Sequence, residues 1–240
     1  MINFIFRLPR YAVFSRFNFN LRFLFFKYWN GTKTINSENA FKVTVSHNVR
    51  QVGSRSDRMN LLIRPLSILE NVTKNAKILV IGPRNEWDLI LLWQAGFDFD
   101  KITGLDLISY SPKVVLGDMH KIPFNDDEFD VVLCGWTLSY SANPDLACLE
   151  ISRVCKNGGI VGIGVEYCDM SDVDQIKNFG YVIQEKDRLA ERINSVDKIL
   201  SFFSFNKVVY FNHDAPLKRN CLGQSPSNCC VLFKYNKADF

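Results

Sequence analysis

The sequence lacks any apolar run that approaches the ~20 residues of a membrane-spanning helix. It also lacks the continuous apolar core and the small-residue cleavage site that mark a secretory signal. We therefore predict a cytoplasmic protein. A formal net charge of +4 is too small to indicate nucleic-acid binding, and 47% hydrophobic with 22% charged residues is typical of a globular chain. With 240 residues, the chain has room for one substantial domain and extensions.

Cysteine pairs with metal spacing are also missing. The seven cysteines form no C-x-x-C pair and no cluster with histidine at the spacing of a zinc site. We interpret them as reduced thiols of a protein core and predict no metal ion. They are Cys134, Cys148, Cys155, Cys168, Cys221, Cys229 and Cys230.

Acidic residues are absent from positions 1–37, which carry six arginines and lysines and eleven interleaved aromatic residues. A basic, aromatic segment of this kind is able to lie on an anionic membrane surface. It is equally able to cover an apolar patch of its own domain or to dock on a protein partner. We therefore expect residues 1–30 to make a peripheral membrane or protein contact, or to pack on the domain, and consider a targeting peptide less favoured. Residues 31–39 are polar and are predicted to form a linker.

Short apolar runs rich in β-branched residues alternate with helical patterns, as in a parallel sheet buried on both faces. This alternation predicts an α/β fold with right-handed crossovers. Helices are expected at 58–70 (kinked near Pro65), 86–95, 143–156 and 196–205, whereas 167–195 is polar and irregular. Strands are expected at 77–81, 101–105, 113–116, 130–134, 160–165, 207–211 and 229–235. The last two suggest a mixed sheet with an antiparallel edge.

The residues best suited to bind a ligand lie at the ends of three predicted strands. Gly82 opens the loop between the first strand and its helix, which suits a ligand bound by backbone amides, but the loop has one glycine where a dinucleotide fingerprint has three. Asp106 and Asp118 follow the second and third strands. Carboxylates at this edge of an open α/β sheet line the crevice where ligands bind. An ionised Asp106 suits the hydroxyls of a ribose, and Asp118 suits an exocyclic amine with Met119 against the ring.

The run Gly117-Asp-Met-His-Lys-Ile-Pro-Phe, followed by Glu-Phe-Asp-Val-Val-Leu-Cys134, resembles the class I S-adenosylmethionine-dependent methyltransferases, in particular their type 11 group. The resemblance covers residues 58–166 well, the tail loosely and residues 1–50 not at all. It implies a Rossmann-like, doubly wound, mostly parallel sheet of seven strands with an antiparallel edge strand. The implied organisation is an N-terminal segment 1–37 and a methyltransferase-like domain 38–240. Within that domain, 58–166 forms the cofactor half and 167–240 holds the late strands and a substrate-side insert.

The resemblance also implies the cofactor, S-adenosylmethionine, and the residues that bind it. Arg84 and Glu86 stand where the family usually has glycines, and Val80 stands where it usually has an acid. We expect Arg84 to pair with the cofactor's carboxylate and Glu86 to meet its ammonium group. The implied cofactor-binding residues are Gly82, Pro83, Arg84, Glu86, Asp106, Leu107, Asp118, Met119, Gly135 and Trp136.

The expected activity is methyl transfer to a small-molecule, saccharide or lipid-linked acceptor. Such transfer depends mainly on geometry, so no catalytic residue is assigned. His120, Tyr140, Glu166 and Tyr167 are the polar candidates for a base, although a structural role is favoured for each. Because the first loop departs from the family pattern, a cofactor-binding adaptor without catalysis stays open. A nicotinamide-dependent oxidoreductase is disfavoured by the missing glycines and by Asp118.

Overall fold

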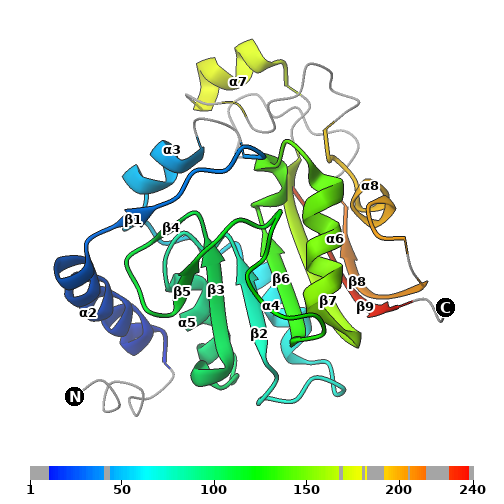
Figure 1. Ribbon diagram of the computed structural model, residues 1–240, viewed down its shortest axis with the longest axis horizontal. Coiled ribbons are helices and arrows are strands. Elements are labelled where there is room, and N and C mark those ends of the chain that lie inside the picture. Colours follow the sequence, from blue (N-terminus) through cyan, green and yellow to red (C-terminus); the bar gives the residue numbers. More distant parts are fainter. Residues whose placement is uncertain are drawn as a thin grey trace.

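A seven-stranded sheet forms the centre of the protein (Figure 1), for which a computed structural model describes residues 11–40, 44–167, 170–179, 182, 192–204, 206–214 and 227–237. The strand order is β5-β3-β2-β6-β7-β9-β8. The strands are β2 (Ile78–Ile81), β3 (Ile102–Asp106), β5 (Val114–Leu116), β6 (Phe129–Gly135), β7 (Cys155–Tyr167), β8 (Asn206–His213) and β9 (Ser227–Asn236).

The first five strands of this sheet pair in parallel, and β9 pairs antiparallel with both β7 and β8. The predicted α/β class and the mostly parallel seven-stranded sheet are confirmed. The antiparallel strand is β9, which lies one position in from the edge and separates β7 from β8. Because five parallel strands share one direction, their carboxyl ends meet at a single edge of the sheet, where ligands bind in open α/β folds.

Helices cover both faces of the sheet (Figure 1). Side chains of β2 alternate between the two cores: Leu79 and Ile81 pack with Ile151 of α6, whereas Ile78 and Val80 pack with α4 and α5. This is the alternation that a strand buried on both faces requires. The helices are α2 (Ala12–Asn30), α3 (Thr44–Arg50), α4 (Asn60–Ser67), α5 (Trp87–Gln94), α6 (Pro144–Val154), α7 (Asp172–Phe179) and α8 (Val196–Ser201), with 3₁₀ turns at Phe99–Lys101 and Leu138–Tyr140.

Several local expectations need correction. The predicted linker 31–39 is tied to the domain, because β1 (Lys33–Thr34) pairs with β4 (Ile108–Ser109) in a second, two-stranded sheet. The helix expected at 58–70 is shorter, because α4 runs from Asn60 to Ser67, with Pro65 inside it. The region 167–195, predicted to be irregular, contains α7; most of residues 180–191 lie outside the described part, as do Cys168 and Cys221. The remaining five cysteines are buried free thiols.

The N-terminal segment packs on the domain through α2, which lies against α5. Phe19 of α2 is buried and makes an edge-on contact with the ring of Trp87, their centroids 5.5 Å apart. Sequence periodicity did not reveal this helix. None of the helices in the described part of the chain combines the length and the apolar character needed to cross a membrane.

Candidate functional site

The loop after β2 begins with a glycine that nothing larger can replace without movement. Gly82 has φ +68°, a conformation that side chains with a Cβ rarely adopt. A Cβ at this position would lie 1.9 Å from Oγ1 of Thr137, in the loop after β6. The two loops therefore touch at Gly82, at the edge of the sheet where the parallel strands end.

Arg84 holds this loop against β3. Its backbone N–H donates to Oδ2 of Asp106 at 2.7 Å, and its φ of +58° is uncommon for a residue with a side chain. The guanidinium donates to Oγ of Ser54 at 3.2 Å. Nε of Arg84 is buried and has no hydrogen-bond partner among the described residues. The side chain thus reaches the cavity described below with donor capacity to spare.

Asp106 is the last residue of β3 and is 6% exposed. Besides the N–H of Arg84, it accepts from the N–H of Ile108 at 3.2 Å. Burial raises the pKa of this carboxyl to about 6, although these backbone hydrogen bonds oppose the shift. The position at the end of the strand agrees with the sequence prediction. The side chain also has a structural part, because it satisfies two backbone donors.

Asp118 follows β5 and is held by the chain itself. Its Oδ2 accepts from the hydroxyl of Ser37, and its Oδ1 lies 2.6 Å from Nδ1 of His120 and accepts from the His120 N–H at 2.9 Å. On the other side of the ring, Nε2 of His120 lies 2.7 Å from Oγ of Ser141. Burial opposes ionisation of Asp118, but the hydrogen bonds from Ser37 and His120 hold its pKa below the usual value. His120 is buried within this chain of contacts.

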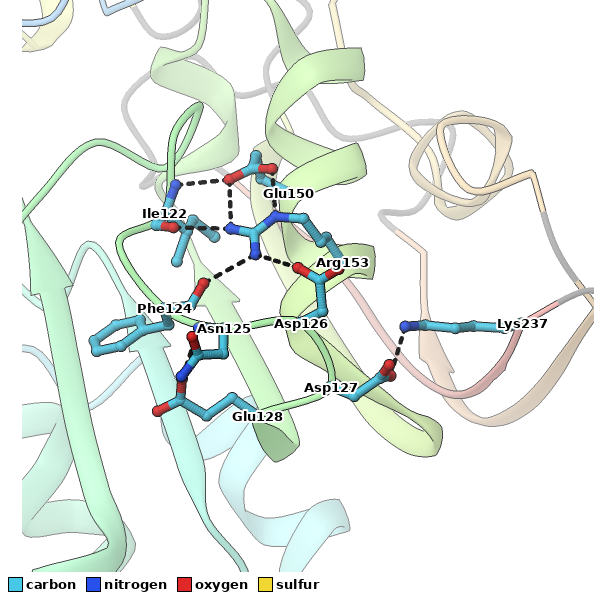
Figure 2. Close-up of polar contacts among 9 residues, drawn as sticks. All are labelled: Ile122, Phe124, Asn125, Asp126, Asp127, Glu128, Glu150, Arg153 and Lys237. Atoms are coloured by element: carbon cyan, nitrogen blue, oxygen red, sulfur yellow. Dashed lines mark hydrogen bonds and ion pairs between the residues drawn. The ribbon is translucent and has the colours of Figure 1, made fainter.

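The stretch of chain that follows Asp118 is fastened to α6 by Arg153 (Figure 2). Its guanidinium donates to the carbonyl oxygens of Ile122 and Phe124, at 2.8 and 2.9 Å. It also contacts the carboxylates of Glu150 and Asp126. A hydrogen bond from Arg153 is the largest cause of the lowered pKa of Glu150. The cluster fixes the path of the loop that carries Asp118 into β6.

The end of β6 brings an aromatic ring to the same edge. Trp136 has φ +57° and is 7% exposed, and its Nε1 donates to Oδ1 of Asn228 at 2.7 Å. The guanidinium of Arg58 lies over this ring, 5.2 Å from its centroid, and also pairs with Glu166. Arg58 therefore already occupies a cation position against Trp136, and Glu166 is engaged as its partner.

Two adjoining cavities open among these loops. They share Asn48 of α3, Gly82, Thr137 and Tyr140, so they lie side by side, and we refer to the pair as the hollow. The first extends along the loop after β2 and the second along the ends of β3 and β5. Of the residues predicted to bind the cofactor, all except Glu86 line this hollow: Gly82, Pro83, Arg84, Gly135 and Trp136 in the first cavity, and Asp106, Leu107, Asp118 and Met119 in the second.

Glu86 lies elsewhere, and its predicted role needs correction. The side chain is fully buried, and both carboxylate oxygens accept from the guanidinium of Arg22 on α2. The hydroxyl of Ser111 also donates to it. Because its carboxylate is bonded to Arg22 and Ser111, Glu86 joins the N-terminal helix to the start of α5 and does not face the hollow. The sequence could not indicate this, because the partner lies 64 residues away.

The acid that does reach the first cavity is Asp88, which sequence analysis missed. It lies in the first turn of α5 and lines the cavity beside Arg84. Burial raises its pKa to about 7, and the positive charge of Arg84 opposes that shift. No described residue forms a hydrogen bond or ion pair with its carboxylate. The sequence did contain a signal for Asp88. It is a second acidic residue, two positions after Glu86, in the first turn of the same predicted helix.

Asn48, Thr137 and Ser54 also line the hollow and were not foreseen. Asn48 and Ser54 come from α3 and the chain after it, where the sequence offered no motif. Among the residues that the structure describes, no group of three or more His, Cys, Asp or Glu side chains is placed to hold a metal ion.

Residues 92–163 match the family model described as a methyltransferase domain. The resemblance to the class I, type 11-like methyltransferases is confirmed. The cofactor of that family, S-adenosylmethionine, is the one predicted from the sequence.

Solved structures with the same fold include two described as S-adenosylmethionine-dependent methyltransferases. That from Mesorhizobium loti is 12% identical, with 75% of this chain and 99% of that chain covered and a TM-score of 0.50. The one from Listeria monocytogenes, described as putative, is 15% identical and has a TM-score of 0.50. The match covers 76% of this chain and 100% of that chain. A putative methyltransferase solved with the Trm112 activator of Haloferax volcanii is 16% identical and has a TM-score of 0.56. The match covers 82% of this chain and 97% of that chain. At these identities the likeness shows the fold.

Two curated proteins are similar over shorter stretches. The sterol 4-C-methyltransferase strm-1 of Caenorhabditis elegans is 44% identical over 52 residues, which is 22% of this chain and 16% of that protein. The uncharacterized protein MJ1123 of Methanocaldococcus jannaschii is 32% identical over 74 residues, 31% of this chain and 33% of that protein. The match thus spans a third or less of the length of either relative.

Proposed function

We propose that this protein binds S-adenosylmethionine in the hollow at the carboxyl ends of β2, β3, β5 and β6 and transfers its methyl group to a small-molecule, saccharide or lipid-linked acceptor. The observation that carries the proposal is that Gly82, Asp106 and Asp118 line the same cavity at the ends of the strands, and that Gly82 also lines the adjoining one. Residues 38–240 would form the catalytic domain, with the cofactor half at 58–166.

The amino-acid end of the cofactor would lie in the first cavity, between Arg84 and Asp88. A zwitterionic α-amino carboxylate needs one cationic and one anionic partner. Arg84 offers a guanidinium whose Nε has no described partner, and Asp88 offers a carboxylate whose pKa burial raises to about 7. The positive charge of a ligand ammonium group would favour the ionised carboxylate and so oppose the effect of burial on that pKa. This pair takes the role that the sequence suggested for Arg84 and Glu86.

The nucleoside end would lie in the second cavity. An ionised carboxylate has about four acceptor positions. Asp106 accepts from the amides of Arg84 and Ile108, and its remaining acceptor capacity suits ribose hydroxyls. Asp118 uses three, on Ser37 and His120, so one stays available for an exocyclic amine. Met119 lines the same cavity and suits contact with the adenine ring.

When bound, S-adenosylmethionine supplies an already activated methyl group, so the residues of this chain need only bind, orient and exclude water. The acceptor would approach past Trp136 and Tyr140, which line the first cavity beside Gly135. Tyr140 would orient the acceptor atom by hydrogen bonding. His120 is committed to Asp118 and Ser141, so it would hold Asp118 in place and leave the acceptor's proton to solvent.

A cofactor-binding adaptor without catalysis is the second candidate. It is favoured by one observation: Ser37, from the N-terminal segment, donates to the carboxylate that would read the adenine. A segment placed over the cofactor site could report its occupancy to a partner. The two candidates separate on transfer of a radiolabelled methyl group to small-molecule and lipid extracts, which the enzyme would label and the adaptor would not.

The binding proposal is tested by titration calorimetry with two ligands that differ only at the amino-acid end. Asp88→Asn should weaken S-adenosylhomocysteine by about 10- to 100-fold, because a charged hydrogen bond contributes roughly 1.5–3 kcal/mol. The same variant should leave 5′-methylthioadenosine unchanged, since that ligand lacks the amino acid. Asp100→Asn, an exposed acid far from the hollow, is the matched control. Equal affinity of wild type and Asp88→Asn for S-adenosylhomocysteine would overturn the assignment of Asp88.

A further inference from the structure

One face of α2 exposes large apolar side chains although the helix is packed on the domain. Trp29 is 76% exposed and Leu24 67%. The exposed residues recur at intervals of three and four, so they share one side of the helix. They are Val13, Phe14, Phe17, Leu21, Leu24, Phe25, Tyr28 and Trp29. A contiguous apolar face of this kind marks a surface that contacts something else.

The opposite face fixes the orientation of the helix. Phe19 and Phe26 are buried in the domain, and Arg22 forms the buried ion pair with Glu86. Because this anchor is buried and bidentate, α2 cannot turn its apolar side inward without leaving a buried charge unpaired. The apolar face therefore points away from the domain. The helix α2 itself lies at the left of the molecule in Figure 1.

The charge beside this face selects its occupant. Arg16 and Lys27 are exposed and, at about 100° per residue, flank the apolar arc on one side. No acidic residue occurs in α2 or anywhere in positions 1–37. A second copy of the same helix would bring like charges together, whereas an anionic surface would complement them. Exposed Tyr28 and Trp29 at the carboxyl end of α2 are residue types that favour the interface between lipid and water.

We propose that α2 is a membrane-surface element that lies in the plane of an anionic lipid layer, with its apolar face among the upper acyl chains and its basic flank at the headgroups. The helix has 19 residues and is about 28 Å long, which suits a helix lying flat. The domain behind it, with its hollow, would be held beside the lipid surface. The proposal does not depend on what the hollow binds.

The intrinsic fluorescence of the full-length protein provides the test. Three of the four tryptophans, Trp87, Trp93 and Trp136, are buried, so Trp29 is the exposed reporter. Adding vesicles of phosphatidylcholine with 30% phosphatidylglycerol should shift the emission to the blue and sediment the protein with the vesicles. Pure phosphatidylcholine should do so much less, and raised salt should weaken the effect. Trp29→Phe should abolish the shift and keep the sedimentation.

Leu24→Asp should lower the partition constant at least about tenfold, because it places a charge in the apolar face. Lys27→Glu should lower it and flatten its salt dependence. Ile68→Asp, at a residue 79% exposed outside α2, is the control and should bind as the wild type does. Binding to anionic vesicles that survives both α2 substitutions would overturn the proposal. So would a dimer by light scattering that Leu24→Asp dissociates, since it would show a second copy on this face.

Discussion

The backbone N–H of Arg84 donates to Oδ2 of Asp106 at 2.7 Å, so the loop after β2 is closed on the residue that ends β3. The contact joins two predicted cofactor residues that are 22 positions apart. It also gives Asp106 a structural task besides ligand binding. The conformation of the loop, with positive φ at both Gly82 and Arg84, is maintained from the neighbouring strand.

Asp106→Ala should therefore reduce both cofactor affinity and stability. Loss of a charged hydrogen bond to the ligand should cost about 1.5–3 kcal/mol of binding, and the two backbone donors left without an acceptor should cost about 1–3 kcal/mol of stability. Calorimetric titration with S-adenosylhomocysteine and urea unfolding measure the two effects. Asp100→Ala, at an exposed acid, should change neither. An Asp106→Ala protein of normal stability would show that the hydrogen bonds to Arg84 and Ile108 contribute little.

Asp88→Asn should stabilise the protein without ligand, in a pH-dependent way. The pKa of Asp88 is raised from 3.8 to about 7, so the folded state binds more protons than the unfolded state between these values. Stability therefore falls as pH rises through this window, and the penalty is complete above pH ~7. Removing the carboxylate should raise the free energy of unfolding at pH 8 by about 1–3 kcal/mol and have little effect at pH 4. Thermal melts of both proteins at the two pH values measure this, and an equal effect at both would contradict the buried-charge explanation.

Glu86→Gln should destabilise the fold and leave the cofactor site intact. Breaking a buried ion pair leaves Arg22 uncompensated and should cost about 3–5 kcal/mol. The double variant Arg22→Met, Glu86→Gln should recover part of this loss, since no charge stays buried. Urea unfolding follows both variants. The affinity of Glu86→Gln for S-adenosylhomocysteine at low temperature should equal that of the wild type. A loss of affinity without a loss of stability would instead show that Glu86 contacts the ligand.

Arg153→Met should loosen the loop between Asp118 and β6. The side chain is 29% exposed, and its bonds to two carbonyl groups and Glu150 should contribute about 1.5–3 kcal/mol. Amide hydrogen exchange in residues 118–128 should become faster. Lys156→Met, which breaks a pair with Asp130 whose side chains are 45% and 40% exposed, should cost at most about 1 kcal/mol and leave that exchange unchanged. Equal exchange in both variants would show that the loop is fixed by other contacts.

The sequence predicted the parts of this molecule that depend on short-range pattern. β2, β3 and β6 are apolar runs buried on both faces, so their period and ends could be recognised, and with them the positions of Gly82, Asp106 and Asp118. The order of β7, β9 and β8 could not be predicted from the sequence, because it depends on a long connection between β8 and β9. Inserting β9 between two strands of the other direction leaves no local signature.

Contacts across long sequence separations account for the remaining differences. In the sequence, Glu86 has the position of an acidic loop residue beside a ligand site. Only the folded structure shows that Arg22 of α2 forms an ion pair with it. Asn48 reaches the hollow because α3 lies over the strand ends, which no motif indicates. Ser37 appeared to belong to a linker, yet it donates to Asp118. In each case the partner is more than 60 positions away or lies in a segment without a pattern.

Titration calorimetry of S-adenosylhomocysteine into the wild-type protein and into Gly82→Ala tests the central claim most directly. We expect one site per chain in the wild type and no competing binding of NAD. Gly82→Ala should lose much of the affinity, because the new Cβ would lie 1.9 Å from Oγ1 of Thr137, where the two loops must admit the ligand. A folded wild-type protein that binds NAD but not S-adenosylhomocysteine, or a Gly82→Ala variant that binds as tightly as the wild type, would contradict the assignment of the cofactor to this hollow.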